Sequence, residues 1–276
     1  MDEAKISIIA DTGCDLDEKF VSDHNVKLIP FRIISDDGHE YRDRFDISAP
    51  DVVKLLENHD LKTSLPTIGD ITKTFDEVKA EGYDHVIVIT ISSKLSGTYS
   101  TISMIAKDYK DLKISVVDSL TLSMAEGFLV MDACDMVKSM NFDDIVKKIE
   151  SRRAFVKAHF VLDTLKYLKK SGRMPETALS LSEILNLKPI FTIKEGHISL
   201  ESISLGKRQA LKLLEKKLDL NATKCAIAYT GSKDESELFA NRFPNFKDII
   251  VYYLGPALSL HGGKGIIGLI YYKCIL

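Results

Sequence analysis

Three polar segments carry side chains that could hold an anion: Lys62–Thr67, Ile91–Tyr99 and Leu258–Gly263. The second segment is rich in serine and threonine, and it lies between an apolar run and a helical pattern. Its hydroxyls and free backbone N–H groups could bind an anion at the start of that helix. The alternative is that these hydroxyls only cap the helix. Taken alone, the segment favours capping.

Motifs of nucleotide, hydrolytic and metal chemistry are incomplete or missing from the sequence. Residues 263–268 read GKGIIG, but the eight residues that follow are too few for a dinucleotide site. The chain contains no GxxxxGK[ST], GxSxG or HExxH pattern. The four cysteines, at positions 14, 134, 225 and 274, form no CxxC pair, so we expect reduced core residues. We therefore expect no metal, no cofactor and no disulfide.

Composition places the chain among ordinary globular proteins. Of its 276 residues, 45% are hydrophobic and 28% are charged, and the formal net charge is −3. This charge predicts no nucleic-acid partner. No apolar run approaches the ~20 residues of a membrane-spanning helix. The acidic start, Met1-Asp2-Glu3, lacks the features of a signal peptide, so we expect a cytoplasmic protein.

The elements that would position these segments alternate between strands and helices. Strands are predicted at 5–10, 26–34, 84–91 and 113–118, and helices at 51–57, 71–80, 99–107 and 124–139. Pro30 within the second strand indicates an edge or a bulge. The run at 84–91 is almost continuously β-branched, as in strands buried on both faces of a parallel sheet. The first half therefore predicts an α/β domain with a mostly parallel sheet.

The second half of the chain has a different pattern of predicted strands and helices. A hairpin is predicted over 188–205, followed by helices at 207–218 and 235–243 and strands at 224–230, 249–254 and 265–272. A hairpin combined with βαβ pieces predicts a mixed sheet. We place a domain boundary near residue 158, giving an N-terminal α/β domain (1–158) and a C-terminal α/β domain (159–276).

A set of spaced motifs resembles the DegV family over nearly the whole chain. The motifs are Thr63–Pro66, Ser92–Tyr99, Val117–Ser119, Leu165–Arg173 and Leu187–Ile190, with Asp11–Leu16 similar to the family's opening Asp-Ser-Thr-x-Asp-Leu. Several motifs in the right order are far more specific than any one of them. The resemblance implies a two-domain fold related to that of dihydroxyacetone kinase, with the ligand between the domains.

The resemblance also implies a function. Members of the family bind one long-chain fatty acid in an apolar tunnel and present its carboxylate to a separate ATP-dependent, dihydroxyacetone-kinase-like acyl kinase for phospholipid synthesis. On this pattern the chain is a lipid-binding carrier and not itself an enzyme. Thr63 and Ser93 would hold the carboxylate, with Ser96, Gly97 and His261 around the head group.

Arg173 resembles an arginine on the kinase-facing side of the family's proteins, and the chain departs from the pattern nearby. Lys264 replaces the proline of a His-x-Gly-Pro-Gly segment, and Leu205 stands where the family usually has arginine. Lys207 or Arg208 could take over that docking role. We expect Lys94 and Lys264 to point to solvent, because a lysine clamp would tie up the carboxylate.

Two other functions stay open at this point. His261 could serve a small-molecule hydrolase or a small-ketone kinase subunit, since the related kinase binds its substrate covalently through a histidine. The chain could also be a lipid-sensing regulator. A plain structural role for His261 is a further alternative.

Overall fold

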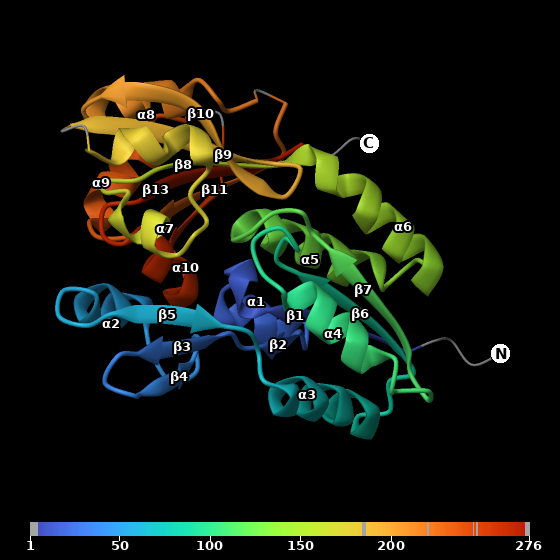
Figure 1. The fold of residues 1–276 in the computed structure, drawn as a ribbon. Coiled ribbons are helices and arrows are strands. Elements are labelled where there is room, and N and C mark those ends of the chain that lie inside the picture. Colours follow the sequence, from blue (N-terminus) through green and yellow to red (C-terminus); the bar gives the residue numbers. More distant parts are fainter. Residues whose placement is uncertain (1–4, 184–185, 220, 245, 247, 274–276) are drawn as a thin grey trace.

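The computed structural model describes residues 5–183, 186–219, 221–244, 246 and 248–273. Three β-sheets and the helices between them build the molecule (Figure 1). A four-stranded and a three-stranded sheet come from the first part of the chain, and a six-stranded sheet comes from the second. In Figure 1 the six-stranded sheet lies above the other two, with α5 and α10 between them.

The four-stranded sheet is parallel, in the order β2-β1-β6-β7. Its strands are β1 (Ile6–Asp11), β2 (Lys27–Ile29), β6 (His85–Thr90) and β7 (Lys113–Asp118). Helices α3 (Ile68–Ala80) and α4 (Thr98–Ala106) pack on one face, and α5 (Met124–Met136) and α6 (Phe142–Arg152) pack on the other. This double cover explains the apolar runs of β1 and β6 and confirms the expected parallel sheet.

Pro30 marks the point where the chain leaves the first sheet. The prediction of one strand over 26–34 is wrong, because β2 ends at Ile29 and β3 (Arg32–Ser35) starts a separate sheet. Proline has no N–H to donate to a strand ladder, so the break falls there. β3 pairs antiparallel with β4 (Glu40–Arg42) and with β5 (Leu61–Ser64).

Most helices of the first half begin at side chains that accept backbone N–H groups, although α4 and α5 have no such cap. Asp17 caps α1 (Glu18–Asp23), and a serine caps α2 (Ala49–Leu55) in the same way. Thr67 and Asp70 form a reciprocal capping box at the start of α3. The four helices predicted in this half are confirmed with small shifts of their ends.

α5 is buried on almost every side because it lies between the two large sheets. It packs against β1 and β6 below and against β8 (Val156–Val161) and β13 (Ile267–Tyr272) above. On this helix Asp132 accepts hydrogen bonds from the Tyr272 hydroxyl and from Lys224 Nζ, at 2.9 Å for the lysine. One hydrophobic core therefore runs from the first sheet through α5 into the second.

The six-stranded sheet has the order β10-β9-β8-β13-β11-β12. Its remaining strands are β9 (Leu187–Lys194), β10 (His197–Leu205), β11 (Lys224–Tyr229) and β12 (Ile249–Tyr253). β11 and β12 run parallel and the other neighbouring pairs run antiparallel, so the expected mixed sheet is confirmed. The predicted hairpin is β9–β10, whose turn residues Glu195 and Gly196 both have positive φ.

The helices of the second half are short. They are α7 (Lys166–Lys170), α8 (Lys207–Glu215), α9 (Lys233–Ala240) and α10 (Pro256–Gly262). Three 3₁₀ segments, η1 (Thr12–Cys14), η2 (Arg153–Phe155) and η3 (Glu176–Glu183), complete the elements. The sequence predicts no helix over the third polar segment, but Leu258–Gly262 form most of α10. A proline at its start and a glycine at its end favour this short helix, which is too brief for a helical sequence period.

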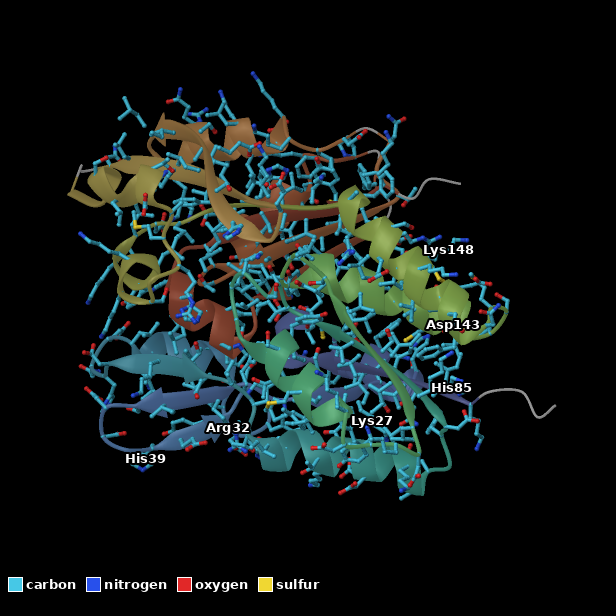
Figure 2. All side chains as sticks on the ribbon, turned by 45° about the vertical axis from the view of Figure 1, so that its right-hand side comes forward. Lys27, Arg32, His39, His85, Asp143 and Lys148 are labelled. Atoms are coloured by element: carbon cyan, nitrogen blue, oxygen red, sulfur yellow. The ribbon has the colours of Figure 1, made fainter. Side chains whose placement is uncertain are left out.

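Charged and polar side chains cover the outer surface, as Figure 2 shows for His39 in the turn before β4 and Lys148 on α6. Arg32 joins β3 to α3 through Asp70, with 3.0 Å between Nε and Oδ2. In the part of the chain that the structure describes, no helix is long and apolar enough to cross a membrane.

Three cysteines, Cys14, Cys134 and Cys225, are buried and free, which confirms the prediction for them. Cys274 lies outside the described residues. The predicted domain boundary at residue 158 falls inside β8. One hydrophobic core contains residues from both sides of this boundary. The division into 1–158 and 159–276 therefore stays a prediction.

Candidate functional site

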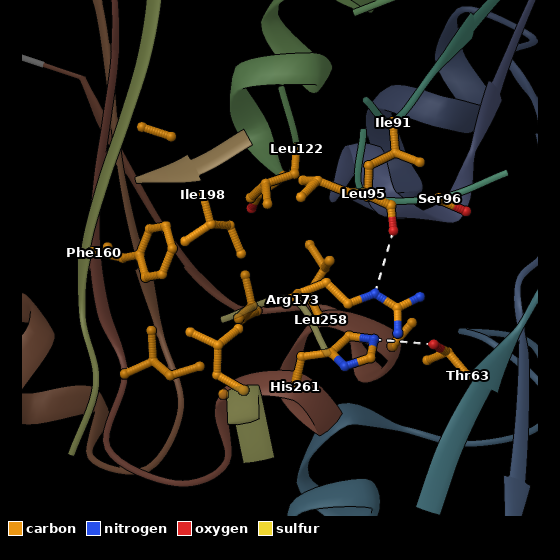
Figure 3. Close-up of a pocket in the computed structure, with 18 of the residues that line it drawn as sticks. Thr63, Ile91, Leu95, Ser96, Leu122, Phe160, Arg173, Ile198, Leu258 and His261 are labelled. Atoms are coloured by element: carbon orange, nitrogen blue, oxygen red, sulfur yellow. Dashed lines mark hydrogen bonds between the residues drawn. The ribbon is translucent and has the colours of Figure 1, made fainter. Parts of the chain in front are cut away.

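A cavity of about 330 Å³ lies between the inner face of the six-stranded sheet, α10, β5 and the loop before α4 (Figure 3). Apolar side chains form most of its wall, among them Phe31, Ile91, Leu122, Phe160, Ile198 and Ile270. Figure 3 shows Thr63, Arg173 and His261 together at one side, with Phe160 across the cavity from them. Because Arg173 is exposed while Ile270 is 3% exposed, the polar side faces solvent and the apolar side is enclosed.

Small residues on neighbouring strands make room for the cavity. Ala158 of β8, Gly268 of β13 and Ala228 of β11 all line it. Gly268 pairs with Ala228 and with Phe160, and Ala158 pairs with Ile270. Side chains alternate between the faces of a strand, so these residues lie on the face that α5 covers. The sheet therefore leaves space where larger side chains would fill the core.

Thr63 and His261 form the polar centre of the site. The Thr63 Oγ1 lies 3.0 Å from His261 Nε2, although 198 positions separate the two residues. Burial, with a smaller effect from the nearby Arg173 charge, lowers the pKa of His261 to about 4. The imidazole is therefore neutral at pH 7. Its Nδ1 is buried and has no hydrogen-bond partner among the described residues.

The loop between β6 and α4 contributes some of the predicted residues and not others. Ser96 and Gly97 line the cavity, whereas Ser93 is not among the lining residues and its N–H donates to Asp118 Oδ1 at 3.1 Å. The Ser96 hydroxyl also accepts the N–H of Thr98, at 3.3 Å. Ser96 therefore lines the cavity while its hydroxyl bonds to Thr98 within the same turn, at 2.8 Å from Thr98 Oγ1. The N-cap residue of α4 is Gly97, so no side chain caps this helix.

Arg173 lines the cavity beside His261, which the sequence does not predict. Its Nε donates to the carbonyl of Leu95 at 3.4 Å, so the arginine bridges the turn after α7 and the loop before α4. The side chain is exposed. Its charge lies close enough to disfavour the protonated form of His261.

The other basic residues around the site differ in their surroundings. Arg208 is exposed in the first turn of α8 and does not line the cavity. Lys207 Nζ pairs with Glu235 at 2.8 Å and approaches Asp163, which follows β8. The start of α8 therefore lies at the same end of the sheet as α7. Leu205 is 67% exposed. Lys94 and Lys264 are also exposed and do not line the cavity, as expected.

The glycine segment after α10 is held by one threonine. The Thr230 hydroxyl donates to the Gly263 carbonyl at 2.6 Å and accepts the Ile266 N–H at 2.9 Å. Gly263 and Gly265 have φ of 71° and 92°, values that favour glycine. A side chain at Gly263 would also collide with Tyr167. Lys264, which stands where the resembling family has proline, lies between these two glycines, and their positive φ values form the turn.

A basic groove of about 180 Å³ adjoins the cavity. It shares Thr63, Arg173 and His261 with the cavity. Its other side is lined by Lys62, Lys166 and Lys170, of which Lys170 pairs with Asp60. The Thr63–His261 pair therefore separates an apolar space from a positively charged one.

Sequence reasoning missed the floor of the cavity and the helix that carries His261. Ala158, Ala228 and Gly268 sit at alternating positions of apolar runs, which is a detectable signal. Their common face follows only from the pairing of β8, β13 and β11, which the sequence does not specify.

A family model described as "Uncharacterised protein, DegV family" matches residues 5–274. Two DegV domain-containing proteins of Clostridium acetobutylicum are 32% and 34% identical to the chain, and each alignment covers at least 96% of both partners. A solved structure described as fatty acid binding of a DegV family protein from Thermus thermophilus has a TM-score of 0.90 and 25% identity, covering 98% of this chain and 100% of that one. A stearic-acid-binding protein from Eubacterium ventriosum has a TM-score of 0.86 and 25% identity, covering 97% of this chain and 98% of that one.

Proposed function

The chain belongs to the DegV family, and from this premise we propose that it binds one long-chain fatty acid in the cavity beside Thr63 and His261. The observation that carries the proposal is the enclosed apolar side of the cavity, which ends at a half-buried, uncharged Thr63–His261 pair. The acyl tail lies along the floor formed by Ala158, Gly268 and Ala228. The relatives described as binding fatty acids share this fold over almost the whole chain.

The apolar wall accounts for affinity. A C16 tail has about 14 methylenes, and burial of each contributes about 0.8 kcal/mol, for a gross total of about 11 kcal/mol. Association opposes this with about 4 to 15 kcal/mol. Useful affinity therefore requires that nearly all of the tail leaves water, which the enclosed apolar side of the cavity supports.

Uncharged donors account for how the carboxylate is held. When the neutral imidazole carries its proton on Nε2, His261 donates to Thr63 Oγ1, and the Thr63 hydroxyl is free to donate to a carboxylate oxygen. The Ser96 hydroxyl and the N–H of Gly97 are the donors from the loop before α4. Hydrogen bonds to a charged acceptor contribute about 1.5 to 3 kcal/mol each. Ser93 has no part in this arrangement, because it does not line the cavity.

We propose further that the protein presents the carboxylate to a separate ATP-dependent acyl kinase in the cytoplasm. The support is the basic groove on the solvent side of the Thr63–His261 pair, where an anionic phosphoryl donor can approach. The proposed docking residues are Arg173, at the mouth of the cavity, and Arg208, at the end of the six-stranded sheet where α7 and α8 begin. The exposed Leu205 gives this surface an apolar contact in place of the family's arginine.

An enzymatic role for His261 has less support. A general base works best with a pKa near the working pH, and burial lowers the pKa of His261 to about 4. Its Nδ1 meets no orienting carboxylate among the described residues. A role as a lipid-sensing regulator would use the same cavity and would differ only in the partner.

Mass spectrometry of the purified, denatured protein tests the proposal. We expect an extracted fatty acid in roughly equal amount to protein, and a protein that stays empty after incubation with palmitate would refute it. Thr63→Val and Ser96→Ala should each weaken palmitate binding at least tenfold, whereas Ser93→Ala, in the same loop, should not. Transfer of phosphate to the bound acid by an added acyl kinase, lost with Arg173→Glu, tests the partner.

A further inference from the structure

Three buried aspartates are not explained by the binding of a fatty acid. Asp11 and Asp15 belong to the opening motif, and Asp43 follows β4. None of them lines the cavity. Asp11 accepts the N–H groups of Gly13 and Ile91 and so joins β1 to the end of β6. Asp15 and Asp43 instead reach across to the second half of the chain.

Both of these carboxylates bind the start of α10. Asp15 Oδ1 accepts the N–H of Gly255 at 3.1 Å, and Asp43 Oδ1 accepts the N–H of Ala257 at 2.9 Å. Pro256 between them has no N–H to satisfy. The N-cap residue, Gly255, has no side chain with which to cap the helix. The first half of the chain therefore supplies the missing acceptors, at the helix end where negative charge is favourable.

The other end of the same helix carries His261. We propose that Asp15 and Asp43 are positioning residues that fix the start of α10 and thereby set the His261 imidazole against Thr63 in the head-group site. This inference rests on the proposed function, because it assigns these residues a role in holding the fatty-acid carboxylate.

The dimensions of α10 make such an effect possible. Its seven residues span about two turns, or about 10 Å, so a shift at one end is carried to the other. A helix this short is unstable by itself, and its place depends on its contacts. Leu260 packs in one cluster with Ile33, while Ala257, Leu258 and His261 line the cavity. The packing fixes the face of the helix, and the two carboxylates fix its position along its axis.

The two carboxylates are costly to bury in their charged form. Burial raises the pKa of Asp15 to about 7 and that of Asp43 to about 6, so keeping them charged opposes folding near neutral pH. Arg44 is the cation that acts on both, and its Nη1 has no hydrogen-bond partner among the described residues. Apolar residues could fill this space without that penalty. What they could not do is accept the N–H groups of Gly255 and Ala257.

Binding of two ligands with the same tail tests the inference. Asp43→Ala should weaken the binding of hexadecanoate about tenfold and change the binding of 1-hexadecanol by less than twofold, because the carboxylate depends more on the head-group geometry. Asp43→Asn keeps an acceptor oxygen and should restore most of the hexadecanoate affinity. Asp17→Ala, which removes a similar carboxylate cap from α1, should leave both affinities unchanged.

A double-mutant cycle with His261 separates positioning from general damage. In a His261→Ala background, Asp43→Ala should cause no further loss of hexadecanoate affinity. Without ligand, the NMR signals of the His261 ring should shift in Asp43→Ala and return in Asp43→Asn. Equal losses for both ligands, additive losses in the cycle or an unmoved His261 signal would overturn the inference. If the wild-type protein bound neither ligand, the proposed function itself would fail.

Discussion

Filling the inner end of the cavity should shorten the fatty acids that the protein binds. Ala158 faces the cavity from β8, is 2% exposed and lies opposite Ile270 in the sheet. Leucine at this position adds about three carbon atoms to the space that the tail would occupy. At about 0.8 kcal/mol for each displaced methylene, Ala158→Leu should cost a full-length tail about 2.4 kcal/mol, or about 50-fold in affinity.

A series of saturated acids from decanoate to octadecanoate gives the assay. In the wild-type protein, affinity should rise about fourfold for each added methylene until the cavity is full. In Ala158→Leu the rise should stop about three methylenes earlier, while acids too short to reach β8 bind as before. Ala154→Leu, which makes the same change at an exposed residue, should follow the wild-type curve.

The stability of the unliganded Ala158→Leu variant provides a second, independent test of a void beside Ala158. The added carbons occupy a void, so the unliganded Ala158→Leu variant should be at least as stable to urea as the wild-type protein. Affinity for long acids and stability should thus change in opposite directions. Equal losses for short and long acids would refute the placement of the tail, and a clear loss of stability would show that no void exists beside Ala158.

Two more predictions concern stability. Burial lowers the pKa of His261 from 6.5 to about 4, so the unfolded chain takes up this proton first as the pH falls through that window. The wild-type protein should lose up to about 3 kcal/mol there relative to His261→Gln in urea titrations at pH 7 and pH 4.5, and parallel pH profiles would contradict the assignment. Asp132→Ala removes the buried partner of Lys224, Arg152 and Tyr272 and should lower the free energy of unfolding by about 3 kcal/mol, with Asp132→Asn losing less. A loss below about 1 kcal/mol in urea unfolding would show that solvent already satisfies these cations.

The sequence predicts the regular parts of the fold because their patterns are local. The apolar run at 84–91 indicates a doubly covered strand, and β6 is the buried centre of a parallel sheet. The turn at Glu195 and Gly196 indicates the β9–β10 hairpin. Both predictions depend on residue types within a few positions of each other.

Prediction of secondary structure from the sequence fails where contacts between distant residues determine the conformation of a segment. The segment 26–34 looks like one strand, yet its two parts join different sheets on either side of Pro30. α10 has no helical period in seven residues and depends on Asp15 and Asp43 for its first acceptors. The conformation of such short segments is determined by contacts with residues far away in the sequence.

The candidate site follows the same rule. Family resemblance led to Thr63, Ser96 and His261, which all line one cavity. It also led to Ser93, which does not, because the path of the loop turns this residue toward Asp118. The alternation of small residues on β8, β11 and β13 becomes meaningful only when the strands are placed side by side.

The Thr63–His261 pair joins two positions that are 198 residues apart. Synthesis from the amino terminus produces Thr63 early and His261 near the very end. A growing chain therefore cannot form this pair until almost all of it has left the ribosome, so the proposed loading with fatty acid would follow synthesis. Contacts at this separation also close slowly, so maturation of the site should be among the last steps of folding.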